Sequence, residues 1–120
     1  MKTPKRCATH AREHIRRVKA DAHDRYAQRT YGLAPGEYQE IYDAQGGKCA
    51  ICRRATGKTK RLAVDHDHRL EGRESVRGLL CGPDNQMIGY AHDDPEFFER
   101  AAAYLRNPPA QRLTSPPDQA

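Results

Sequence analysis

Apolar positions recur at helical spacing near both ends of the chain and alternate only in its middle. A thin apolar stripe that includes Ile15 and Tyr26 predicts a helix over residues 9–31, ended by Gly32. Pro35 then begins a shorter helix, which the glycine pair at 46 and 47 closes. The first third of the chain is therefore expected to be helical.

The alternating segments lie in the middle of the chain. Residues 61–66 place Leu62 and Val64 on one side, as a short half-buried strand would. Val76–Leu80 predicts a second strand, after a polar loop over residues 69–75. Two short strands among helices indicate an α+β fold.

Helical spacing returns after the second strand. Pro83–Ala91 is expected to form a short helix. Asp94-Pro95-Glu96 is typical of a helix start, with a capping side chain, a proline in the first turn and an acid near the positive end. Asn107-Pro108-Pro109 should stop this last helix.

These patterns predict one domain with two extensions. Residues 1–31 form a basic helical arm, and residues 32–106 form the domain. Deletion of the arm should do little harm to the folding of the domain. Residues 107–120 hold four of the eight prolines and predict a disordered tail. With 37 % hydrophobic residues and no tryptophan, so small a core would gain from a bound metal.

The excess positive charge is concentrated in the arm. The chain carries +5, yet residues 1–31 hold nine Lys/Arg against three Asp/Glu, and residues 48–61 hold six Lys/Arg and no acid. Such stretches favour a nucleic-acid partner, although a solvated helix face that binds nothing would look the same. The expected DNA contacts are Arg16, Arg17, Lys58, Lys60, Arg61 and Arg77.

The N-terminus is polar and basic, and the chain contains no apolar run of membrane length. We therefore expect no secretion and no membrane partner, but the cytoplasm of a bacterial or phage-infected cell. In that reducing compartment, four cysteines are expected to be metal ligands or thiols rather than a disulfide framework.

Three of the cysteines have metal-ligand spacing. Cys49 and Cys52 form a Cys-x-x-Cys pair after a glycine turn, and Cys81 is followed three positions later by Asp84. Zinc accepts three thiolates and a carboxylate, so these four residues predict a structural zinc site. Alternatively, Cys49 and Cys52 are a redox pair, which the absence of a βαβ pattern disfavours, and Asp84 is merely a helix-start residue.

The run Asp65-His66-Asp67-His68 directly follows the first predicted strand. Acid and imidazole alternate, so one carboxylate can hold a cation while the next histidine faces substrate. A polar strand end that simply meets solvent is the alternative. The neighbouring Cys-x-x-Cys pair, Arg77 and Asn85 count against it.

From Tyr31 to Leu105, about three-fifths of the chain, the sequence resembles the recombination endonuclease VII family of phage-type His-Asn-His (HNH) nucleases. The segments that carry the resemblance are Tyr31-Gly32-Leu33, residues 46–52, residues 64–68, residues 76–81, Asn85, Gly89 and Asp93-Asp94-Pro95. The resemblance implies a ββα-metal (His-Me finger) fold clamped by zinc. It departs from the family at Asp84, where the family pattern has cysteine.

The resemblance also implies residue roles. Asp65 and Asn85 would hold the catalytic cation, His66 would be the general base, and His68 would lie near the scissile phosphate. Independently, imidazole titrates near neutral pH, and Mg²⁺ or Mn²⁺ can neutralise charge in phosphodiester hydrolysis.

We therefore expect a metal-dependent DNA endonuclease, a hydrolase that acts on branched or junction DNA or nicks DNA for a phage. A homodimer would suit a two-strand cut. The alternative function is a catalytically silent, zinc-stabilised DNA-binding module.

Overall fold

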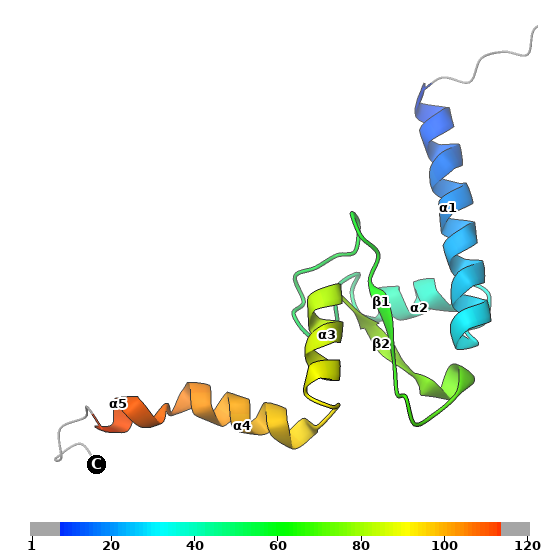
Figure 1. Cartoon of the computed structure of the whole chain (residues 1–120). Helices are drawn as coiled ribbons and strands as arrows, with labels where there is room; N and C mark the ends of the chain where they lie inside the picture. Colours follow the sequence, from blue (N-terminus) through cyan, green and yellow to red (C-terminus); the bar gives the residue numbers. More distant parts are fainter. Residues whose placement is uncertain (1–7, 114–120) are drawn as a thin grey trace, which may run out of the picture. The chain divides into compact units, whose positions relative to one another are not determined.

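The computed structural model describes residues 8–113, and residues 1–7 and 114–120 lie outside this description. The described part is α+β, as predicted, and combines helices with a two-stranded antiparallel sheet (Figure 1). Its elements are α1 (Ala8–Tyr31), α2 (Glu37–Ala44), β1 (Ala63–His66), the 3₁₀ helix η1 (Gly72–Ser75), β2 (Val76–Leu80), α3 (Gly82–Tyr90), α4 (Pro95–Arg106) and α5 (Pro109–Leu113).

The chain divides into two compact units, Met1–Gly82 and Pro83–Ala120, so the division falls in the first turn of α3. The first unit holds α1, α2, η1 and the sheet. The second holds the rest of α3 together with α4 and α5.

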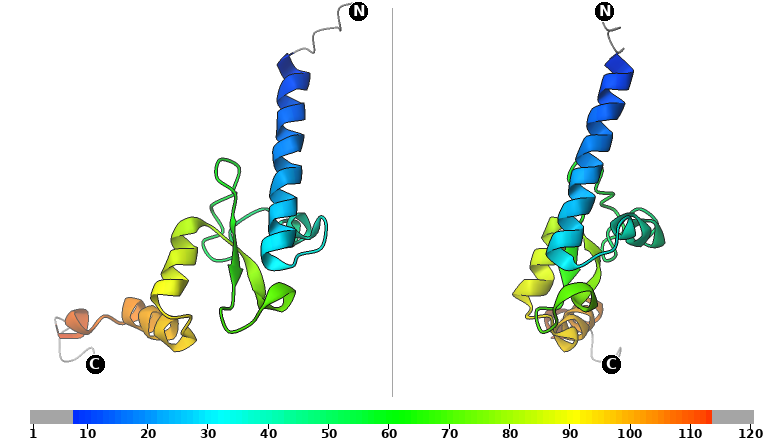
Figure 2. Two further views of the ribbon diagram at one scale, coloured as in Figure 1. Left: turned by 45° about the vertical axis from the view of Figure 1, so that its right-hand side comes forward. Right: turned by 90° about the vertical axis from the view of Figure 1, so that its right-hand side faces the viewer.

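The two halves of α1 differ in their surroundings. Up to residue 22 nearly every side chain is exposed, and these turns extend away from the sheet of the same unit (Figures 1 and 2). From His23 onward the helix packs on the unit: Ala27 is 1 % exposed, and the Asp24 carboxylate accepts the Gly36 N–H. A deletion ending at residue 30 would therefore remove part of the core, contrary to the expectation for a dispensable arm.

Gly32 turns the chain out of α1 with a φ of 72°. A Cβ at this position would lie 2.9 Å from the backbone nitrogen of Arg73, so glycine is needed both for the turn and for this close approach.

The sheet is short and closely packed. Ala63 pairs with Leu80 at one end and His66 with Val76 at the other, and a bulge makes Arg77 the extra residue of β2. Leu79 and Cys49 are fully buried in the core of this unit. Besides Ala27, the other buried apolar residues of this unit are Leu33, Tyr38, Leu62, Val64 and Leu80.

Gln45 fastens the end of α2 to the sheet. Its amide accepts the Leu79 N–H at 2.8 Å and donates to the Leu79 carbonyl at 2.9 Å. A Cβ on Gly78 would lie 3.1 Å from the Gln45 Oε1, so the glycine leaves room for this contact.

The second unit begins its longest helix where the sequence predicts. The Asp94 carboxylate caps α4 by accepting the Glu96 N–H at 3.1 Å, and Pro95 occupies the first turn. Within the predicted tail, Pro109–Leu113 form α5, and residues 114–120 lie outside the described part. None of the helices described is long and apolar enough to cross a membrane.

Candidate metal centre and candidate active site

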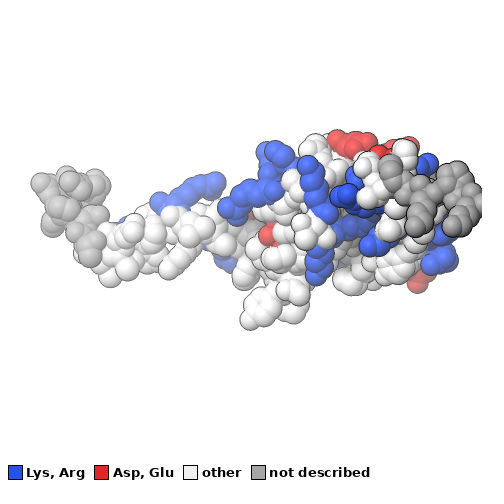
Figure 3. Space-filling view, turned by 90° about the horizontal axis from the view of Figure 1, so that it is seen from above, with Lys and Arg blue, Asp and Glu red and all other residues white. Residues whose placement is uncertain are grey.

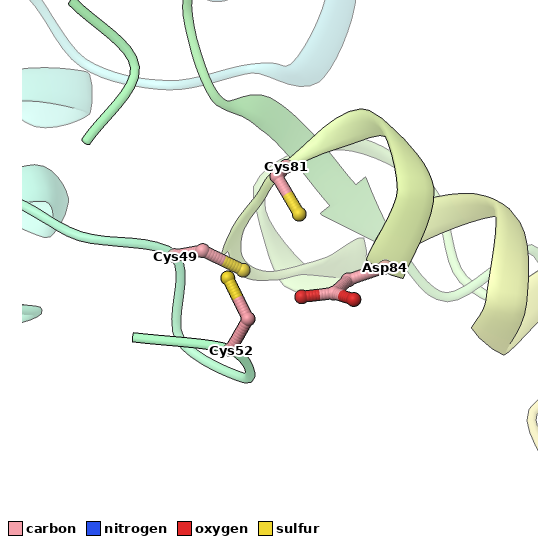
Figure 4. A group of neighbouring side chains, drawn as sticks. All are labelled: Cys49, Cys52, Cys81 and Asp84. Carbon is pink, nitrogen blue, oxygen red and sulfur yellow. The ribbon is translucent and has the colours of Figure 1, made fainter. Parts of the chain in front are cut away.

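The four predicted zinc ligands lie together. One potential ligand atom each from Cys49, Cys52, Cys81 and Asp84 is within 4.8 Å of all the others. Figure 4 shows three sulfurs and a carboxylate converging on one point. Tetrahedral zinc with Zn–S bonds of about 2.3 Å needs sulfurs about 4 Å apart. The cluster therefore fits a structural zinc ion after small side-chain adjustments.

Backbone hydrogen bonds bring the ligand loop to the sheet. The Cys49 N–H donates to Ala55, the Arg53 N–H donates back to Cys49, and the Ala50 N–H donates to the Leu79 carbonyl at 3.2 Å. This folds the Cys-x-x-Cys segment into a tight loop beside β2. Cys81 directly follows β2, so the three thiols meet at that end of the sheet.

The Asp65–His66 block lies at the other end of the sheet. Asp65 is 7 % exposed, and both of its carboxylate oxygens accept hydrogen bonds from the Arg77 guanidinium, at 2.7 and 2.9 Å. The sequence predicted a cation ligand at Asp65 and a DNA phosphate contact at Arg77. The structure pairs these two residues with each other, which the sequence alone did not indicate.

His66 is flanked by two rings. Its centroid lies 4.4 Å from that of His68 and 5.6 Å from that of Tyr31, the last residue of α1. Tyr31 also packs edge-on against Tyr26, and burial, followed by the Tyr26 phenol, raises the pKa of Tyr31. The phenol therefore stays protonated at neutral pH.

Tyr31 was not predicted as a site residue. Its only sequence signal was its place in the Tyr31-Gly32-Leu33 segment of the family resemblance. The contact with His66 joins residues 35 positions apart, and no local pattern reports it.

Asp67 braces the turn after β1. Its N–H donates to the Ser75 carbonyl at 2.7 Å, and its carboxylate accepts from both the backbone and the guanidinium of Arg69. The bonds from Arg69, first from its guanidinium and then from its backbone, hold the pKa of Asp67 well below its usual range. Asp67 is therefore ionised at neutral pH and fixes the loop beside His66.

The remaining predicted residues are placed separately. Asn85 lies in α3, directly after Asp84, and its pairing with Asp65 around a cation stays a prediction. Arg16, Lys58 and Arg61 line one groove of the first unit, Arg17 lines an adjoining cavity, and Lys60 is exposed. Cys7, which has a ligand-like spacing to His10 in the sequence, lies outside the described residues.

Comparison with known proteins agrees with the family resemblance. Residues 23–107 match the recombination endonuclease VII family, and the match begins where α1 starts to pack on its unit. The chain is 50 % identical over 109 residues to the Gene 59 protein of Mycobacterium phage L5, covering 90 % of this chain and 65 % of that protein.

The Gene 59 protein of Mycobacterium phage D29 is 49 % identical over 109 residues, covering 90 % of this chain and 64 % of the relative. The chain therefore spans just under two thirds of the length of these curated relatives. The family match covers well over half of the chain. The chain belongs to the recombination endonuclease VII family.

Proposed function

We propose that the chain is a metal-dependent DNA endonuclease of the HNH type, whose reactive centre lies around His66 at the end of β1. The observation that carries the proposal is the position of His66, a partly exposed imidazole that contacts two other rings and follows the buried Asp65 in the chain. Membership of a nuclease family supports DNA as the substrate.

His66 acts as the general base in this proposal. Imidazole accepts a proton near neutral pH, and the exposed part of the ring gives water access to it. Contacts with the rings of Tyr31 and His68 restrict the movement of this imidazole. His68, which is exposed and contacts the His66 ring, would meet the scissile phosphate in this proposal.

The residues beside His66 suit a hard cation. Each oxygen of the Asp65 carboxylate accepts one bond from Arg77, and a carboxylate offers about four acceptor positions. Asp65, completed by the Asn85 amide, would hold Mg²⁺ or Mn²⁺ through oxygen ligands. Such a cation, when bound, neutralises charge on the reacting phosphate and the departing oxygen.

The sulfur cluster has a structural role in the same proposal. Zinc bound by Cys49, Cys52, Cys81 and Asp84 would clamp β1, β2 and α3 as a ββα-metal core. Because the relatives come from mycobacteriophages, we place the activity in the cytoplasm of an infected cell, on branched DNA or as a nicking reaction. A homodimer would allow cuts in both strands.

Cleavage of three DNA substrates tests the proposal. Zinc-loaded protein, dialysed free of other metals, is incubated with supercoiled plasmid, linear duplex and a four-way junction, with and without Mg²⁺ or Mn²⁺. We expect cutting only when the cation is added, and none by His66→Ala. Zinc content is measured in each sample, so that loss of the fold is not mistaken for loss of chemistry.

A second candidate function is a catalytically silent, zinc-stabilised DNA-binding module. The bidentate Asp65–Arg77 pair favours it, because it engages the carboxylate that the nuclease needs for its cation. DNA binding without cutting in any of these conditions would select the module and reject the nuclease.

A further inference from the structure

A basic groove lies in the first unit between α1, α2 and the loop that precedes β1. Its volume is about 460 Å³, and Arg16, Lys19, Lys58 and Arg61 line it with no acidic residue among its described lining. The first two cations come from α1 and the other two from the loop, some 40 residues later. The fold therefore gathers positive charge from two separate segments.

Two tyrosines of α2 hold the loop side of this groove. The Tyr38 hydroxyl donates to the Leu62 carbonyl and the Tyr42 hydroxyl donates to the Thr56 carbonyl, each at 2.6 Å. Gly57 turns the loop with a φ of 71°, and a Cβ there would lie 2.9 Å from the Leu62 side chain. The cations of the loop are therefore mounted on a fixed backbone.

The positive lining continues along α1. A second cavity of about 440 Å³ shares Arg16 and Arg61 with the groove and adds Arg17, with Glu13 its single described acid. Lys and Arg predominate over Asp and Glu on the face that Figure 3 shows. A lining that extends along a helix matches a linear polyanion better than one compact anion.

We propose that this groove binds the phosphate backbone of DNA at a distance from the phosphate that is cut. The distance between the groove and the cut phosphate rests on the proposed function of His66, whereas the binding of DNA by the groove does not. Tyr31 contacts His66, and Lys19 and Arg16 precede it on α1 by 12 and 15 residues. At about 1.5 Å per residue this is roughly 18–22 Å. It corresponds to about five to seven base pairs at 3.4 Å each.

Matched pairs of arginine substitutions test the groove. Arg16→Gln with Arg61→Gln removes one cation from each side of it. Arg25→Gln with Arg54→Gln is the control, because both are exposed arginines of the same helix and the same loop. Both pairs are made in the His66→Ala protein, and binding to a fluorescent duplex is measured from about 0.1 M to 0.5 M salt.

Each lost phosphate contact should lower the log–log salt slope by about 0.9, so the groove pair should lower it by about 1.8. Such a loss weakens binding roughly 60-fold at about 0.1 M salt and fades towards 1 M. The control pair should change the slope by less than about half of one contact. Equal losses for the two pairs, or none for either, would overturn the proposal, as would competition by polyglutamate as strong as that by DNA.

A length series separates this proposal from the proposed nuclease function. In protein with His66 intact, kcat/KM is measured on duplexes that extend two to twelve base pairs beyond the cut. The groove pair should lower kcat/KM only when the extension exceeds about five base pairs. If the protein cuts no DNA but its salt slope still depends on the groove, the nuclease function is rejected and DNA binding by the groove is kept. If the groove pair leaves cutting unchanged at every length, DNA binding by the groove is rejected and the nuclease function is kept.

Discussion

The two ends of the short sheet hold their polar side chains in different ways. Beside Leu80, thiols and a carboxylate converge, and such a group is held together by a shared cation. Beside His66, about 10 Å away along the strand, the carboxylates bond to arginines: Asp65 to Arg77 and Asp67 to Arg69. With the proposed zinc bound, the first end would keep its geometry through the metal, whereas the second keeps its geometry through ion pairs within the protein.

This difference implies two kinds of metal dependence. A metal that organises thiols from separate loops contributes folding energy, because the unfolded chain has no such site. A cation that joins an arginine-braced carboxylate can exchange without unfolding the sheet. Loss of the first metal should therefore cost structure, and loss of the second should cost only activity.

The largest effect should come from Cys81→Ser. Zinc sites of this type supply about 10–16 kcal/mol of apparent binding energy, against about 5–15 kcal/mol of total stability for a whole domain. We therefore expect zinc loss and an unfolded first unit, measured by metal analysis and circular dichroism. Cys7→Ser is the control and should keep zinc; a cooperative melt of zinc-free Cys81→Ser at the wild-type temperature would contradict the structural role.

A substitution at the His66 end of the sheet should change only the rate of DNA cleavage. His66→Ala should lower the cleavage rate by about 10²–10⁴-fold, the usual contribution of a general base. Zinc content, melting temperature and DNA affinity should remain those of the wild type. His14→Ala, on the exposed half of α1, removes an imidazole elsewhere and should cut normally. Wild-type cleavage by His66→Ala would reject the mechanism.

Local sequence patterns predicted much of the sheet and its metal ligands. The apolar alternation over residues 61–66 located β1, and the Cys-x-x-Cys spacing grouped Cys49 with Cys52, since both patterns depend on neighbours in the chain. The order and spacing of the Cys, Asp-His and Arg-Gly-Leu-Leu-Cys blocks indicated the family, which the match over residues 23–107 confirms.

Contacts between distant segments could not be predicted in this way. The Arg77 bulge turns a guanidinium onto Asp65, and one shift of register is invisible to an alternating pattern. The apolar stripe of α1 also failed to show which half of the helix packs: Ile15 is 53 % exposed, whereas Ala27 is buried. Burial there depends on where Gly32 returns the chain against η1.

Substitutions of Asp84 test how strongly the cluster of Cys49, Cys52 and Cys81 depends on its fourth ligand. Carboxylate binds zinc less tightly than thiolate, so Asp84→Cys should raise the melting temperature and Asp84→Ala should lower it. In a domain of this size about 1 kcal/mol moves the melting temperature by about 4–8 °C. Asp84→Asn is the control for a purely helix-start role: if Asn and Ala both melt like the wild type under a chelator series, Asp84 does not bind the metal.

Tyr31 tests how the His66 end keeps its geometry. Removing the ring in Tyr31→Leu should lower kcat by between about tenfold and 10²-fold with little change in KM, because a misplaced base affects the reaction more than binding. Tyr31→Phe keeps the ring and should restore the rate. The His66 proton resonances should shift in the Leu variant and not in the Phe variant; a loss of kcat in both would assign the role to the hydroxyl instead.

The smallest effect concerns His23, whose ring packs edge-on against Tyr38 with centroids 4.5 Å apart. Burial, followed by the nearby Arg61 charge, lowers the pKa of His23. The unfolded chain then binds the proton more readily than the folded one. The free energy of unfolding therefore loses nothing to His23 above about pH 7, and it decreases as the pH drops through about 6.5 towards the folded pKa. Urea unfolding at pH 7.5 and 5.5 should show a larger loss for the wild type than for His23→Gln.

Zinc release must be followed in the same samples, because protonation of the cluster thiolates also weakens the fold at low pH. The two proteins share that contribution, so only the difference between them reports on His23. Equal losses in both would show that His23 adds nothing to the acid sensitivity of the fold, contrary to the lowered pKa that its burial produces.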